Sequence, residues 1–149
     1  MPPTTSRVAQ QTDEEINARI RRQTENNVAY FGKDGSQAIG ERLRELDREW
    51  DLERLLEANA ATIALTGLCL GSLVNRRWFV LPAVVAGFLL QHAIQGWCPP
   101  IPVFRRLGMR TQSEIEQERY ALKAMRGDFK TIQGNGDDRT GAVMEAVRA

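Results

Sequence analysis

The chain has 149 residues, the size of one ordinary domain. Its 20 Lys and Arg residues against 19 Asp and Glu residues give a net charge of +1, which excludes nucleic-acid binding through bulk positive charge and excludes an acidic tail. The mean hydropathy of −0.38 is typical of a soluble protein only as an average, because the runs 58–75 and 78–104 contain no charged residue.

Residues 1–38 are predicted to form a cytoplasmic segment that is first disordered and then helical. Residues 1–12 are polar and contain paired prolines, a composition typical of a disordered start. Thr12 followed by Glu15 fits a capping box, so a helix is expected to begin near Asp13. The first residues contain no apolar stretch, and no cleavable signal peptide is therefore expected.

Residues 39–57 are predicted to form an amphipathic helix. Its apolar residues recur at steps of four, three and four and share one face: Ile39, Leu43, Leu46 and Trp50. This face fits packing on a soluble core, or a position on a membrane surface with Trp50 at the level of the headgroups. The apolar runs that follow favour the interfacial interpretation.

Residues 58–104 are predicted to form a transmembrane hairpin with spans at 58–75 and 78–98. At about 1.5 Å per residue, each run approaches the roughly 30 Å hydrocarbon core of a bilayer. Trp78 and Trp97 lie near the two ends of the second span, as interfacial anchors do. The alternative is a hairpin buried in a globular core, but the flanking segments are too charged to cover two such helices. The predicted fold class is all-α, an antiparallel two-span hairpin flanked by cytoplasmic amphipathic helices.

The distribution of basic residues predicts the orientation of this hairpin. Nine Lys and Arg residues lie within 38–57 and 105–124, beside the outer ends of the spans, whereas the turn carries only Arg76 and Arg77. The positive-inside rule then places both termini in the cytoplasm, with the bacterial inner membrane as the expected location.

Residues 105–127 are predicted to form a further cytoplasmic helix, and residues 128–149 a flexible tail. Ser113 with Glu116 fits a second capping box, and a Gly/Asp-rich stretch at 134–138 interrupts the tail. Aromatic and basic residues at the ends of the apolar segments are the expected contacts with the membrane interface: Trp50, Trp78, Trp97, Arg105 and Arg106.

Small residues recur at intervals of four in both spans. Gly67 and Gly71 form a GxxxG pair, and Ala83 and Gly87 repeat the spacing in the second span. Such pairs let two helix backbones approach closely, which predicts close helix packing. The spacing fits contact within one hairpin and contact between two subunits of a homodimer.

Three polar side chains lie deep in the second span: Gln91, His92 and Gln95. Polar groups in hydrocarbon need partners, so we expect them to face protein or the interface. His92 is expected to snorkel to the interface or to bridge helices, with a proton relay or metal ligation as the alternative. Cys69 and Cys98 are too few and too far apart for a zinc site, and no nucleophile–base set or phosphate loop is present, which predicts no metal, no cofactor and no catalysis.

The motif Gly96-Trp97-Cys98-Pro99 follows the second apolar helix. In this context the chain resembles the YgaP-like transmembrane domain family of bacterial inner-membrane proteins, a two-helix hairpin with a Gly-x-Cys-Pro motif formed here by Gly96, Cys98 and Pro99. The resemblance covers roughly residues 50–110, and it implies a homodimerising hairpin that occurs alone or attached to a rhodanese sulfurtransferase domain. Neither cysteine begins the loop that surrounds a rhodanese catalytic cysteine, so the standalone form is expected and sulfur transfer is assigned to no residue.

The sequence therefore predicts a non-enzymatic membrane anchor or scaffold subunit. Its expected partners are the lipid bilayer, a second copy of the chain and a cytoplasmic protein, with no nucleic acid. The alternative is a redox or sulfur-handling component that uses Cys98 together with a separate sulfurtransferase. A small pore is less favoured, because the polar residues are few for a water-filled lining.

Overall fold

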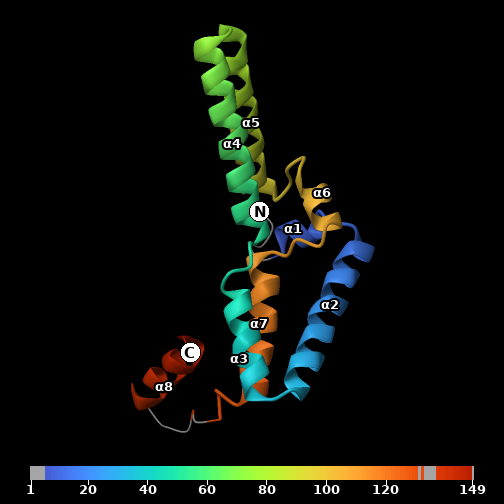
Figure 1. Ribbon diagram of the computed structural model, residues 1–149, viewed down its shortest axis with the longest axis vertical. Helices are drawn as coiled ribbons and strands as arrows, with labels where there is room; N and C mark the ends of the chain where they lie inside the picture. Colours follow the sequence, from blue (N-terminus) through green and yellow to red (C-terminus); the bar gives the residue numbers. More distant parts are fainter. Residues whose placement is uncertain (1–5, 131, 133–136, 149) are drawn as a thin grey trace. The chain divides into compact units, whose positions relative to one another are not determined.

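The computed structural model describes residues 6–130, 132 and 137–148, and this part of the chain is helical without a strand (Figure 1). The elements follow in the order α1 (Arg7–Gln10), α2 (Glu14–Lys33), α3 (Ser36–Leu46), α4 (Leu52–Leu73), the 3-10 helix η1 (Arg76–Phe79), α5 (Val80–Gln95), α6 (Ile101–Arg106), α7 (Gln112–Arg126) and α8 (Asp137–Arg148). The chain divides into two compact units. The first unit comprises residues 1–21 and 50–113, and the second comprises residues 22–49 and 114–149.

The first unit contains two helices that are long and apolar enough to cross a membrane. Helix α4 begins at Leu52 because the Asp51 side chain caps it, accepting a hydrogen bond from the Arg54 backbone N–H at 2.6 Å. After a short turn, η1 and α5 return alongside α4 (Figure 1). The second apolar segment covers Arg76–Gln95. The expectation of two apolar helices of spanning length is thus confirmed.

The bounds of these helices differ from the predicted ones. The first begins at Leu52 rather than at residue 58, and the second ends at Gln95 rather than at residue 98. Gly96 ends α5 by adopting a left-handed conformation with φ 78°, which a glycine tolerates at little cost. The prolines that follow then lie at the start of α6.

Short helices pack around the outer ends of α4 and α5 in the first unit. Their shared core consists of Val8, Leu52, Leu56, Cys98 and Ile101. The burial of Val8 within α1 corrects the expectation that residues 1–12 are uniformly disordered, although residues 1–5 lie outside the described residues.

The second unit is built on α3 and α7. Its buried core consists of Ile39, Leu43, Leu46, Ile115 and Leu122. The apolar face of α3 thus packs against other helices of this unit, which agrees with the interpretation as packing on a core. It is not free to lie on a membrane surface, as the interfacial interpretation requires. The predicted helix over 39–57 is also interrupted, because α3 ends at Leu46 and Asp51 caps a new helix.

The helix predicted over 105–127 is shorter in the structure, because α6 ends at Arg106 and a new helix, α7, begins at Gln112 and ends at Arg126. Its start lies one residue before the Ser113 of the expected capping box. The predicted tail contains α8, and the Lys123 Nζ donates a hydrogen bond to the Val147 carbonyl at 2.7 Å. The expected Gly-rich break lies mostly outside the described residues.

Candidate functional site

The Gly-x-Cys-Pro motif forms the link between α5 and α6. A side chain at position 96 would be strained by the positive φ, and its Cβ would lie 2.7 Å from the Cβ of Arg7. Arg7 also donates a hydrogen bond from Nη1 to the carbonyl of Ala93 at 3.1 Å. The glycine therefore serves two purposes, because it ends α5 and lets α1 approach the end of that helix.

Cys98 lies in the middle of this link and is buried, whereas Cys69 on α4 is exposed; both thiols are free. Burial raises the pKa of the Cys98 thiol above its ordinary value. The thiol therefore stays neutral and contributes an apolar surface, as free buried cysteines commonly do.

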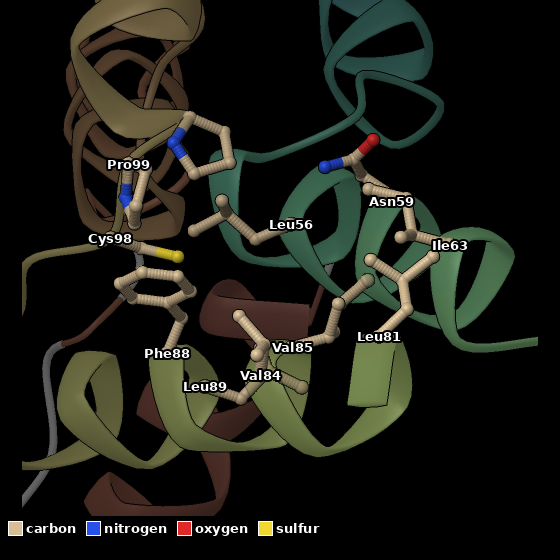
Figure 2. A pocket seen from close by; sticks show the side chains of 12 residues that line it. Leu56, Asn59, Ile63, Leu81, Val84, Val85, Phe88, Leu89, Cys98 and Pro99 are labelled. Carbon is tan, nitrogen blue, oxygen red and sulfur yellow. The ribbon is translucent and has the colours of Figure 1, made fainter. Parts of the chain in front are cut away.

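An apolar cavity of about 250 Å³ opens next to Cys98, between α4 and α5. Figure 2 shows the Cys98 sulfur directed toward Leu56 and the Phe88 ring, with the Asn59 amide at the edge of the group. Three segments of the first unit line it: Leu56, Asn59, Ala60 and Ile63 of α4, Leu81, Val84, Val85, Phe88 and Leu89 of α5, and Cys98, Pro99 and Pro100 of the link.

Asn59 differs from the other lining residues because its amide is strongly polar. It is half-buried, and within the described part of the chain it makes no hydrogen bond. An asparagine within the uncharged run 58–75 is visible in the sequence, and this signal could have singled it out; its position on the cavity could not be read from the sequence.

The four small residues fall into two groups in the structure. Gly67 faces α5, where a Cβ would be 2.6 Å from Cδ of Pro82, and Gly71 faces η1, where a Cβ would be 2.8 Å from the Phe79 ring. Ala83 and Gly87 are exposed, and a Cβ at Gly87 would meet nothing within 4 Å. The first pair therefore packs within one chain, and the second pair leaves a free surface on α5.

The three polar residues of α5 do not share one environment. His92 is buried, Gln91 is half-buried and Gln95 is exposed. The Nδ1 of His92 has no hydrogen-bond partner within the described residues. The Nε of Arg7 and the Oε2 of Glu53 also have none there, and the charges of Arg7 and Glu53 both act on this histidine. No group of three His, Cys, Asp or Glu side chains in the described ranges is placed to hold a metal ion.

Two of the expected interfacial tryptophans are exposed. Trp50 lies between α3 and α4, where the Arg54 guanidinium is 4.4 Å from its ring, and Trp78 lies in η1. Trp97 is half-buried and Arg106 is exposed.

Arg105 is placed differently from the expectation, because its side chain is 0% exposed. Its Nη2 donates to the Asn17 side-chain oxygen at 2.9 Å, and its Nη1 donates to the Met109 carbonyl at 3.0 Å. Asn17 in turn donates to the Ala9 carbonyl at 2.9 Å. Arg105 thus ties α6 to α2 instead of facing a membrane surface, and Asn17 is a residue that the sequence did not single out.

Comparison with known proteins yields no match: no protein-family model, no curated protein and no solved structure is significantly similar to this chain. The resemblance to the YgaP-like domain therefore rests on the Gly96-Trp97-Cys98-Pro99 motif in its place after two apolar helices.

Proposed function

We propose that the chain is an integral protein of a bacterial inner membrane in which α4 and α5 form a transmembrane hairpin. The main support is where the apolar side chains lie. In the apolar 18-residue stretch of each segment, only 22% of the first and 6% of the second is buried within the protein. The core helix of a soluble protein would be mostly covered, whereas a helix in a bilayer exposes its apolar side chains to lipid.

The position of the charges supports an orientation with both termini in the cytoplasm. Nine basic residues lie beside the outer ends of the hairpin, whereas only two lie in the turn. The second unit is rich in ion pairs, among them Arg42 with Glu118 at 2.7 Å and Arg119 with Asp47 at 2.6 Å, which suits an aqueous compartment.

The function that best fits these features is that of a membrane anchor or scaffold of YgaP-like type without catalysis of its own. The hairpin holds the protein in the membrane, and the helices of the second unit offer a surface to a cytoplasmic protein. The neutral, buried thiol of Cys98 supports a packing role for the motif rather than sulfur chemistry.

Extraction of membranes with alkaline carbonate tests membrane integration. We expect the chain to remain in the pellet and to be released only by detergent, as integral proteins are. A variant with Leu65, Leu68 and Leu90, all exposed on the apolar helices, changed to lysine serves as a matched control and should be released. Release of the unaltered chain by carbonate would contradict the proposal.

The proposed homodimer is assigned to α5, because the Ala83 and Gly87 surface is open. Crosslinking in membranes should give less dimer for Gly87→Leu than for the unaltered chain, since leucine would keep two α5 backbones apart. The control is Leu68→Ala, which makes an exposed side chain on α4 smaller and leaves the α5 surface unchanged. Equal dimer yields for Gly87→Leu and the unaltered chain would remove this surface from the proposal.

A further inference from the structure

We propose that the cavity beside Cys98 binds one acyl chain of a bilayer phospholipid, with the lipid's ester carbonyl accepting a hydrogen bond from the Asn59 amide. This inference rests on the proposed membrane location of α4 and α5. It assigns a specific lipid site to a hairpin that otherwise only anchors the protein.

The residues that line the cavity indicate which class of ligand it can bind. The walls are formed by aliphatic and aromatic side chains such as Ile63, Val85 and Phe88, together with the proline rings of the link. A cavity of about 250 Å³ with such walls is not suited to water, because water needs two or more polar partners. In a bilayer the available apolar ligand is a hydrocarbon chain, and filling the cavity with it restores the contacts that an empty space lacks.

The Asn59 amide requires a hydrogen-bond partner from any ligand that fills this apolar site. This half-buried amide has no hydrogen-bond partner among the described residues, and an unpaired amide in hydrocarbon is costly. Asn59 lies six residues from Glu53, about 9 Å along the helix axis, and therefore near the outer end of the apolar segment. Phospholipids carry their ester carbonyls at that level, directly above the acyl chains.

The cavity thus fits an amphipathic ligand in one orientation, with its polar end at Asn59. The acyl chain extends from Asn59 along Ile63 and Val85 between the helices, and the Cys98 sulfur closes the side formed by the link (Figure 2). All the residues that line the cavity belong to α4, α5 and the link, so the site lies beside the two apolar helices that the proposal places in the bilayer.

The test uses the full chain in vesicles of phosphatidylethanolamine and phosphatidylglycerol that contain a phosphatidylethanolamine with a photoreactive group on one acyl chain. Crosslinked positions are mapped by mass spectrometry at increasing mole fractions of the probe. Labelling of Val85 and Phe88 is expected to saturate, as at a site. Labelling of Ala86 and Leu90, which are exposed at similar depth, is expected to grow in proportion to the probe.

Two variants and one control separate a site from general lipid contact. Val85→Trp fills the cavity and should reduce labelling of Phe88 about tenfold. Asn59→Leu should raise the half-saturating mole fraction about threefold, the effect of one net hydrogen bond. Ala86→Trp places the same bulk on an exposed position and should leave Phe88 labelling unchanged.

Each other outcome counts against the site. Labelling of Val85 and Phe88 that never saturates, or that is equal in Val85→Trp and Ala86→Trp, would overturn it. A photoreactive free fatty acid that competes better than the phospholipid would overturn the assigned lipid class. If the chain were absent from the vesicles after carbonate extraction, the membrane proposal itself would fail. If the chain remained inserted but its labelling only grew in proportion to the probe, the lipid site alone would fail.

Discussion

Glu118 is a fully buried acid of the second unit, and its carboxylate organises the contact between helices. It accepts hydrogen bonds from the Nε of Arg42 at 2.7 Å and from the side-chain amide of Asn27 at 3.2 Å. Burial alone would lower the pKa of Arg42, but its hydrogen bonds to Glu118 and Glu45 raise that pKa above the ordinary value. Arg42 is therefore charged in the folded protein, and Glu118 connects α7 with α3 through Arg42 and with α2 through Asn27.

Replacing Glu118 should loosen this unit. Glu118→Ala removes the carboxylate from a site where it is 0% exposed and leaves the Arg42 guanidinium without its best partner, which is expected to cost about 3 kcal/mol. Hydrogen exchange of the α3 and α7 backbone amides in the full chain measures the loss.

Glu45→Ala is the matched control for this experiment, because Glu45 pairs with the same arginine at 2.9 Å but its side chain is 61% exposed. Its loss should change the exchange free energies by less than about 1 kcal/mol. Similar losses in the two variants would show that burial of Glu118 is not what gives the pair its strength.

The raised pKa of Cys98 makes a prediction about its reactivity. In membranes that carry Cys69→Ser, maleimide should alkylate Cys98 more slowly than a cysteine in an unstructured peptide, because less thiolate is present at a given pH. The rate should continue to rise with pH above the pKa of the peptide thiol. Denaturation in a strong detergent should restore the rate of the peptide. A faster reaction than that of the peptide would favour the redox or sulfur-handling alternative.

Among the elements, α4 and α5 show how small residues set the distance between helices. Gly67 meets Pro82 and Leu81, and Gly71 meets the Phe79 ring, so neither position has room for a larger side chain. Gly67→Leu should force the two helices apart and lower the thermal midpoint of helix unfolding in lipid vesicles, measured by circular dichroism.

Gly87→Leu has the same chemical change on α5 but meets open space within the chain. At a protein-to-lipid ratio low enough to keep the chain monomeric, it should leave that midpoint nearly unchanged. This comparison separates packing within the hairpin from helix propensity, since both substitutions remove a helical glycine. If the two variants had equal midpoints, the close contact at Gly67 would contribute nothing to stability.

Helix α3 illustrates what periodicity can and cannot predict. The spacing of Ile39, Leu43 and Leu46 correctly indicates an apolar helix face, but the same spacing serves a membrane surface and a protein core. The partners that bury this face, Ile115 and Leu122, lie on α7, about 70 residues further along the chain. A local pattern contains no information about such a distant partner.

For the molecule as a whole, the separation of charged and apolar segments is the basis of the proposed topology. Reporters fused after residue 149 and within 75–77 should lie on opposite sides of the membrane, with the C-terminus in the cytoplasm. Alkaline phosphatase should be active only at the turn and green fluorescent protein only at the C-terminus. The same reporter active at both positions would exclude a hairpin with two spans.

The sequence by itself determined the features that depend on local composition. Two long uncharged runs define two apolar helices, and the small residues at intervals of four predict close helix contact. It could not assign that contact, which the structure gives to Gly67 and Gly71 while Ala83 and Gly87 remain exposed.

Only the tertiary structure decided which side chains are buried together. In the structure Arg105 donates a hydrogen bond to Asn17, and both Cys98 and Asn59 line the same cavity. The physical reason is that hydrogen bonding and burial depend on neighbours distant in sequence, whereas helix formation and hydropathy are set by residues a few positions apart.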